Sequence, residues 1–378
     1  MSTVNRNKAK LGMINREIIS EMLHRMDAGK RLEAIVTELV FRRTYGYSEL
    51  SPAATYGWMT TDSSCAERRK KFGRDWYICA KSVNEIASCT SALINAFERK
   101  DYRFFLVTDI VIHNSAGTVE FRVLKLENNE GGVQAYLDKA ITADLMEKVN
   151  ARVRRVHGQA AISTWSILPY LQHVESDELL SLYTSRCLMD FGLDFPTDID
   201  AVDVSSGKLI VYEFKRKDPS DSYYMPNSHV SLPSYGKYFE NVKKSLLNNQ
   251  GNSTRNDTHS ELITNHNATF YEMQCYGLDY RSHVKNFITC NFNGVVYRYV
   301  IWNRSQDPIP EMVAPNLFPL GSFILMQADL KPASFAGFNF TEPRKSGDVQ
   351  KKRITRFQCM VPKSHFTPAQ CWWGRITT

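Results

Sequence analysis

The sequence lacks the segments and motifs that would place it in several large classes of proteins. No run of about 18 apolar residues is present, which argues against a membrane-spanning helix. The N-terminus has no apolar stretch followed by a small-residue cleavage site, so we expect a soluble, intracellular, cytoplasmic protein. No C-x-x-C occurs, and no Cys/His group has the spacing of zinc ligands. The absence of G-x-x-x-x-G-K-[ST] excludes a P-loop ATPase within this chain.

What the chain does contain is sufficient for a folded core. Its 378 residues can form two domains or one large elaborated domain, and 43% of them are hydrophobic and 12% aromatic. The eight cysteines are scattered, and we expect them to be reduced and at least partly buried. The net charge of +7 is mild, so it suits a polyanionic partner without requiring one. No internal sequence repeat and no low-complexity tract is evident.

Hydrophobic spacing predicts an N-terminal α+β domain over residues 1–158. Our hypothesis for its role is substrate binding or regulation. The expected elements are helices within 12–43, at 82–98 and at 133–156, and two strands at 103–113 and 118–127.

A second unit is expected over residues 159–305, followed by a C-terminal extension over 306–378 with one strand and a basic tail. The expected elements are a mainly helical segment before residue 193, strands at 198–204 and 208–215, a polar loop at 217–262 containing one helix near 236–248, a helix at 268–282, two strands within 283–303 joined at Asn293-Gly294, and a strand at 322–330.

The most informative stretch is PTDIDAVDVSSGKLIVYEFKRKD. Side chains alternate between the two faces of a strand, so Asp198 and Asp200 share one face and Asp203 takes the other. On the second strand Glu213 and Lys215 share a face. A Ser-Ser-Gly turn between the strands would bring Asp200 or Asp198 close to Glu213.

Two neighbouring carboxylates repel each other unless a cation lies between them. Hard divalent ions such as Mg²⁺ take oxygen ligands of this kind, usually with several waters. A lysine two residues further along can align an attacking water and offset charge on a phosphate. These are the parts needed to hydrolyse a phosphodiester bond.

Two other triplets in the chain have the same residue types but not the same context. Glu98-Arg99-Lys100 lies at the end of an expected helix, without a paired strand. Asp329-Leu330-Lys331 ends an expected strand, but the carboxylates before it lie in a segment broken by prolines. Glu213 alone has an acidic partner strand, a tight turn and a preceding helix in the expected structure.

With these features, residues of about 170–303 resemble the PD-(D/E)XK nuclease superfamily, the fold of many restriction enzymes, Holliday-junction resolvases and RecB-type exonucleases. The family core runs helix, three strands, helix, strand. Pro196-Thr197-Asp198-Ile199-Asp200 followed by Glu213-Phe214-Lys215 fits its signature, although Thr197 separates the proline from the acid. The resemblance implies an α/β (α+β) chain with a restriction-endonuclease-like mixed sheet flanked by helices, plus the N-terminal α+β domain.

The resemblance also implies roles for individual residues. Asp200 and Glu213 would bind Mg²⁺, or Mn²⁺ in its place, assisted by the backbone carbonyl of Phe214. Asp198 is an alternative to Asp200 as the metal ligand. Lys215 would position the attacking water.

Two further family features have weaker counterparts in this chain. Members often carry a glutamate in the first core helix, for which Glu178 and, less well placed, Glu175 are the candidates. RecB-type members place a glutamine and a tyrosine in the helix after the third strand, and Gln274 and Tyr276 resemble these at imperfect spacing.

Clusters of basic residues add candidate contacts to nucleic acid. Residues 67–77 mix cations with Trp76 and Tyr77, a combination that binds phosphates and stacks on bases. Further basic residues occur at 152–155 and at 351–356. A solvated surface is the alternative interpretation of each.

The sequence therefore predicts a Mg²⁺-dependent endo- or exonuclease that acts on nucleic acid, with DNA as the expected substrate and without a membrane. Restriction or other phage defence and DNA repair or recombination are contexts that suit such an enzyme, and a homodimer is compatible with this interpretation. The alternatives are a non-catalytic nucleic-acid-binding protein with a degenerate nuclease fold, an RNase that uses the same site, and a protein without a nucleic-acid role. In the last case the hairpin is half-exposed and its charges form ordinary surface pairs.

Overall fold

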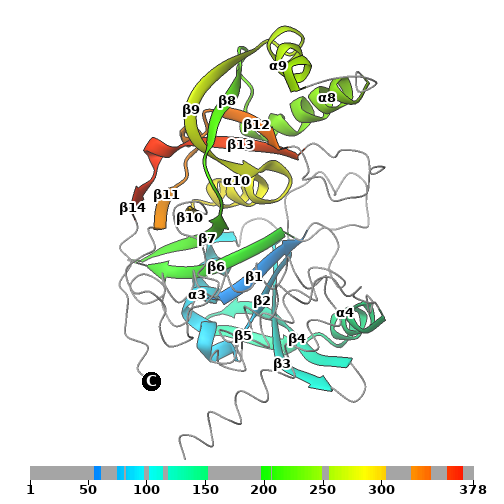
Figure 1. The fold of residues 1–378 in the computed structure, drawn as a ribbon. Coiled ribbons are helices and arrows are strands. Elements are labelled where there is room, and N and C mark those ends of the chain that lie inside the picture. Colours follow the sequence, from blue (N-terminus) through cyan, green and yellow to red (C-terminus); the bar gives the residue numbers. More distant parts are fainter. Residues whose placement is uncertain are drawn as a thin grey trace, which may run out of the picture.

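The described residues form a mixed α+β architecture in which strands outnumber helices (Figure 1). A computed structural model describes residues 55–60, 75–80, 82–97, 102–113, 118–151, 197–205, 207–248, 255–303, 325–341 and 356–368.

A ten-stranded sheet forms the larger part of the described structure. Its strands run in the spatial order β14-β11-β10-β7-β6-β1-β2-β3-β4-β5. Their bounds are β1 Thr55–Thr60, β2 Asp75–Cys79, β3 Arg103–His113, β4 Thr118–Asn129, β5 Gly132–Leu137, β6 Thr197–Ser205, β7 Lys208–Arg216, β10 Val296–Trp302, β11 Leu325–Asp329 and β14 Thr367–Pro368.

The two halves of this sheet repeat one pattern of strand pairing. In the first half, β1–β2 is antiparallel, β2–β3 parallel, and β3–β4 and β4–β5 antiparallel. In the second half, β6–β7 is antiparallel, β7–β10 parallel, and β10–β11 and β11–β14 antiparallel. The halves meet where β1 pairs antiparallel with β6. The sheet thus continues across the domain boundary that the sequence predicts at residue 158.

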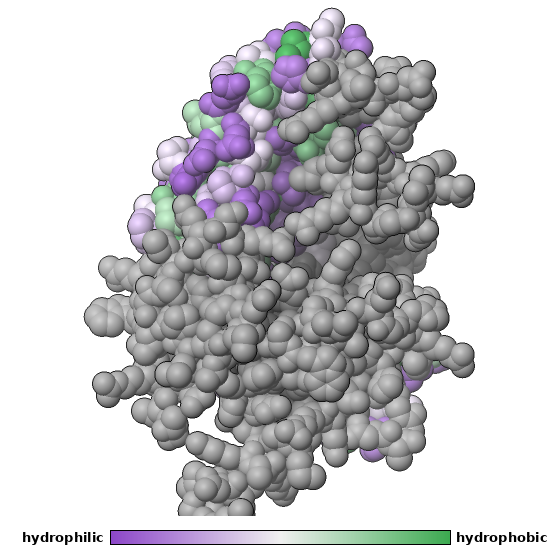
Figure 2. Space-filling model, viewed as in Figure 1, coloured by the Kyte–Doolittle hydropathy of each residue, from purple (hydrophilic) through white to green (hydrophobic). Residues whose placement is uncertain are grey.

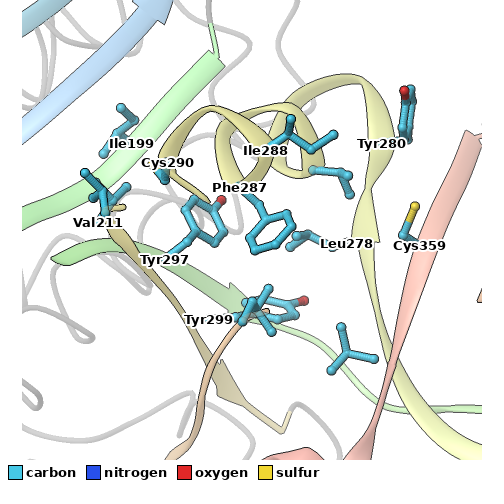
Figure 3. Close-up of a cluster of buried hydrophobic side chains, with 14 of the residues drawn as sticks. Ile199, Val211, Leu278, Tyr280, Phe287, Ile288, Cys290, Tyr297, Tyr299 and Cys359 are labelled. Carbon is cyan, nitrogen blue, oxygen red and sulfur yellow. The ribbon is translucent and has the colours of Figure 1, made fainter. Parts of the chain in front are cut away.

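Parallel pairing requires a long crossover connection, which usually contains a helix. The connection of each parallel pair in this sheet contains at least one helix. α3 (Val83–Phe97) lies in the chain between β2 and β3, and α10 (Lys285–Phe292) precedes β10. Figure 3 shows α10 against the sheet, with Phe287 and Cys290 near Tyr297 and with Cys290 also near Val211, and Ile288 belongs to the same core cluster. All five side chains are buried, and burying a large apolar side chain contributes about 1.5–3 kcal/mol. This packing fixes the helix over the strands that carry the candidate site.

A small closed barrel is inserted between β7 and α10 and is completed by strands near the C-terminus. Its strand order is β12-β13-β9-β8 (Figure 1). The face over the barrel in Figure 2 mixes hydrophilic and hydrophobic residues. The bounds of its strands and of the neighbouring helices are β8 Ser220–Pro226, β9 Ala268–Asp279, β12 Gly337–Thr341, β13 Arg356–Pro362, α8 Tyr235–Asn248 and α9 Arg255–Thr264.

Most of the predicted elements that fall on described residues are confirmed. α3, β3, β4, β6, β7, α8, β10 and β11 lie where hydrophobic spacing predicts them. The helices expected within 12–43 and the helical segment before residue 193 lie outside the described residues. The polar loop expected at 217–262 also contains β8 and α9, and the tail contributes β12, β13 and β14.

Three expectations are wrong. The helix predicted at 133–156 begins only with α4 (Lys139–Ala151), because the residues before Asp138 form β5. The helix predicted at 268–282 is mainly the strand β9. The segment before Asn293-Gly294 is α10, so this dipeptide joins a helix to a strand and does not form a β-hairpin.

In the parts of the chain that the structure describes, no helix is both long enough and apolar enough to cross a membrane.

Candidate functional site

The predicted hairpin is confirmed and forms the centre of the second half of the sheet. β6 and β7 pair antiparallel from Ser205–Lys208 to Ala201–Tyr212. Gly207 in the turn has a φ of 73°, a left-handed conformation that glycine adopts without strain. β7 is also paired along its other edge, parallel to β10. The carboxylates of the hairpin therefore project from central strands, which hold them in place.

A bulge in β6 falls at the predicted metal ligand Asp200. Thr55 of β1 pairs with Val202, and Gly57 pairs with Ile199, so two steps along β1 match three along β6. The extra residue lies at Asp200 or Ala201. β-bulges interrupt pairing and redirect side chains, and they are common beside active sites. Here the bulge coincides with the end of the β6–β7 ladder that lies away from the turn, because the ladder ends at the pair Ala201–Tyr212.

Asp200 reaches from β6 across to β7. Its side chain is buried, with 4% of the residue exposed, and Oδ2 accepts a hydrogen bond from the Phe214 backbone N–H at 2.6 Å. A carboxylate thus occupies the position at which β6 would otherwise continue the ladder. The bond fixes the Asp200 carboxylate beside the residue next to Glu213.

Glu213 is the most deeply buried carboxylate of the site, with 1% of the residue exposed. Its Oε1 forms an ion pair with the Lys215 ammonium and lies 2.8 Å from His283 Nδ1. The His283 contact is close but lies outside hydrogen-bonding angles. Its Oε2 accepts a hydrogen bond from the Tyr297 hydroxyl at 3.0 Å. Three polar side chains from three elements therefore surround one buried carboxylate.

The site opens to solvent on the side of Lys215, whose side chain is 30% exposed. Glu213 lies beneath it, and the His283 side chain is 11% exposed. Lys215 is therefore the most exposed of the side chains that contact Glu213.

The electrostatics of the surrounding groups agree with this burial. The pKa of Tyr297 is raised well above its usual value, first because the hydroxyl is removed from water and then because the Glu213 charge disfavours a second anion. The pKa of Tyr299 is also raised by burial, an effect that the Lys215 charge partly offsets. Both hydroxyls therefore stay protonated at neutral pH, and Tyr297 serves as a donor to Glu213.

Three residues of this arrangement were not identified from the sequence. Tyr297 reaches Glu213 from β10, and His283 reaches it from a π-turn, Tyr280–Val284, that leads into α10. Asn286, the third, is buried in α10 and accepts a hydrogen bond from the Thr197 hydroxyl of β6 at 2.7 Å. One sequence signal points to the segment that carries His283. Asp279 precedes this segment, and its side chain accepts a hydrogen bond from the Arg281 backbone N–H, as the N-cap of a helix does.

Gln274, predicted for a helix beside the metal, lies instead on β9 of the barrel. Its side chain is exposed and accepts a hydrogen bond from Lys363 at 3.1 Å. Tyr276 is buried on the same strand and contacts the Phe366 ring at 5.1 Å between centroids. The predicted helical context for these two residues is therefore wrong.

The remaining predicted residues are placed in part or not at all. Asp198 lies on β6 opposite Trp58, and its side chain is not described. Glu178 lies outside the described residues. Asp203 is buried opposite Ile210, on the face of the hairpin away from Glu213, as the alternation of side chains predicts.

The two described aromatic residues of the first basic cluster do not form a stacking surface. Trp76 and Tyr77 are buried in β2, with 0% and 6% of each residue exposed. Trp76 packs against Phe97 at 5.0 Å between ring centroids. The prediction that these two rings stack on bases is therefore wrong. The cationic part of the cluster and the basic residues at 152–155 lie outside the described residues.

The donors of the site fit a hard divalent ion of the Mg²⁺ type. Mg²⁺ is commonly held by one or two carboxylates and keeps several waters, and Asp200 and Glu213 supply two carboxylates from adjacent strands. The Phe214 carbonyl lies between them in the chain as a further oxygen. Within the described ranges no group of three or more His, Cys, Asp or Glu side chains is arranged to hold a metal ion.

Comparison with protein-family models, with curated proteins and with solved structures finds no match to this chain.

Proposed function

We propose that this chain is a metal-dependent nuclease that hydrolyses phosphodiester bonds, with DNA as its substrate and Mg²⁺ as its ion. The observation that carries the proposal is the pair of buried carboxylates, Asp200 and Glu213, on adjacent strands with the Lys215 ammonium at the solvent side. Taking carboxylates out of water is costly unless cations compensate them. A site that buries two of them beside a partly exposed lysine is suited to binding a cation and an anionic substrate.

In the proposed reaction the side chains of the chain orient the reactants. Asp200 and Glu213 hold the ion, and Lys215 leaves Glu213 to align a water and to balance the charge that develops on the phosphate. A bound divalent ion supplies a positive charge for the phosphate oxygens and makes bound water more acidic. The water oxygen joins phosphorus as the bond from phosphorus to the leaving sugar oxygen breaks, and that oxygen receives a proton.

The direct test is incubation of supercoiled plasmid with the protein in the presence of Mg²⁺ or of EDTA. We expect nicked or linear product with Mg²⁺ alone. Glu213→Gln and Lys215→Ala should each reduce the rate by ~100-fold or more. The matched controls are Glu272→Gln, an exposed acid on β9, and Lys208→Ala, an exposed lysine at the start of β7, and both should cleave as the wild type does.

The same variants separate the proposal from its alternatives. Lys215→Ala should still bind DNA, measured by fluorescence anisotropy over a series of salt concentrations, because phosphate contacts weaken steeply with salt. Equal cleavage by wild type and Glu213→Gln would contradict the proposed site. Salt-sensitive binding without cleavage under any condition would indicate a non-catalytic binding protein. Faster cleavage of RNA than of DNA in a mixed assay would change the substrate.

A further inference from the structure

Glu213 is held by donors that differ in how freely they can move. Lys215 carries its ammonium on a flexible chain, and its side chain is 30% exposed. Tyr297 is fully buried on a central strand. His283 is buried in the π-turn before α10, and its neighbour Val284 is completely buried in the main core. When a cation arrives at Glu213, like charges drive Lys215 away, while the histidine and the tyrosine remain.

The π-turn is itself fixed at both ends. Asp279 caps its start by accepting from the Arg281 backbone N–H at 2.9 Å. After it, Phe287 of α10 packs against the Tyr297 ring at 6.1 Å between centroids. A single turn of π-helix, as here, is rare and is frequently found at functional sites. This one places a buried imidazole against a buried carboxylate, and its surroundings leave the imidazole little room to turn away.

We propose that His283 is a positioning residue, which holds Glu213 Oε1 through its Nδ1–H so that the carboxylate faces Asp200 and binds the divalent cation. This inference rests on the proposed metal site and deepens it. The present contact of 2.8 Å is short but poorly aligned. Hydrogen bonds at catalytic groups are often poorly aligned before ligands bind and tighten afterwards. Partners that orient a ligating carboxylate contribute strongly, and their removal lowers metal affinity by about 10- to 100-fold.

The test uses Mn²⁺ alone as the probe, titrated calorimetrically into the full-length protein without nucleic acid. His283→Leu removes the donor and should raise the dissociation constant for Mn²⁺ by about 10-fold or more. His283→Asn carries its amide nitrogen near the position of imidazole Nδ1 and should stay within ~3-fold of wild type. His283→Gln carries its amide near Nε2 and should bind as weakly as the leucine variant. The asparagine–glutamine pair keeps the test valid should His283→Leu fail to fold, as monitored by circular dichroism.

Equal Mn²⁺ affinity in wild type and His283→Gln would overturn the inference, as would equal losses in the asparagine and glutamine variants. A wild type that binds no Mn²⁺ would overturn both the inference and the metal site. A wild type that binds Mn²⁺ but cleaves no nucleic acid would overturn the proposed nuclease function alone, because the order of Mn²⁺ affinities among the variants is measured without cleavage.

Discussion

At the scale of single residues, Lys217 joins the sheet to the barrel. It directly follows β7, and its ammonium donates a hydrogen bond to the Gly277 carbonyl of β9. The Tyr299 hydroxyl of β10 donates to the same carbonyl at 3.0 Å. The pKa of Lys217 is lowered to about 8, first because burial removes the ammonium from water and second because Lys215 repels it. Folding at neutral pH therefore includes the cost of burying a positive charge.

This pKa predicts how stability depends on pH. The pKa of Lys217 is about 8 in the folded protein and 10.5 without perturbation, so between these values the unfolded chain binds more protons. The stability from this group is thus present at high pH and is lost as the pH falls through about 8. Relative to Lys217→Met, the free energy of unfolding of wild type should rise by about 1–2 kcal/mol from pH 7.5 to 9.5. Urea unfolding at both pH values measures this difference, and a difference independent of pH would contradict it.

The residues of the candidate site could be predicted where they belong to one local pattern. Strand alternation was sufficient for Glu213 and Lys215, since both lie on one strand of a hairpin with a recognisable turn. His283 and Tyr297 are 70 or more positions away from Glu213 in the chain and meet it only through the tertiary fold. Sequence spacing carries no information about such contacts, which depend on how α10 and β10 pack beside β7.

At the scale of elements, the helix predicted at 133–156 starts too early because turn chemistry overrode hydrophobic spacing. Gly132, with a φ of 102°, closes the β4–β5 hairpin, so the residues after it continue as a strand. The Asp138 side chain then accepts from the Ile141 backbone N–H at 2.9 Å and caps α4. A glycine followed six residues later by a capping aspartate is a readable boundary. The apolar spacing from residue 133 onward is compatible with a helix on both sides of this boundary, so spacing alone did not locate it.

Closure of the barrel depends on a close approach at Gly337. A Cβ at this position would lie 2.2 Å from the Tyr224 carbonyl oxygen of β8. Backbone cannot move aside as the end of a flexible side chain can. The neighbouring residue Phe338 pairs with Tyr224, and this pair links β12 to β8. A side chain at Gly337 would therefore separate the two strands that close the barrel.

We accordingly predict that Gly337→Ala lowers the free energy of unfolding by ~1–3 kcal/mol, the usual cost of overpacking. The matched control is Gly131→Ala, because a Cβ at Gly131 has no atom within 4 Å, and it should unfold as wild type does. Chemical denaturation monitored by circular dichroism gives both values. A Gly337→Ala variant as stable as the control would show that β8 and β12 can separate without cost.

At the scale of the whole molecule, the pairing of β1 with β6 makes one sheet of two similar halves. Ile199, Ala201 and Val202 of β6 are buried where this pairing occurs. The similarity of the halves is absent from the sequence because the crossovers differ, with residues 80–102 between β2 and β3 and residues 217–295 between β7 and β10. A repeat of pairing without a repeat of sequence could not be predicted by inspecting the residues.

The shared sheet predicts that the expected nuclease unit will not fold by itself. A fragment of residues 159–378 would lose β1 and would expose the edge of β6 together with its buried apolar side chains. Exposed apolar edges promote association with other chains. We expect this fragment to aggregate in size-exclusion chromatography under conditions in which the full chain elutes as a defined species. A monodisperse fragment with the circular dichroism of a folded protein would instead support the domain boundary at residue 158.

The order of the barrel strands along the chain also has a consequence during protein synthesis. β8 and β9 are complete at residue 279, but their partner β13 ends at residue 362, which is 83 residues later (362 − 279). At about 5–20 residues per second, a ribosome needs about 4–17 s to make that stretch. Throughout this interval Cys275 and Leu278, which are buried in the finished protein, lack the strand with which they pair. The nascent chain thus passes through a stage of several seconds in which a chaperone has an apolar strand to protect.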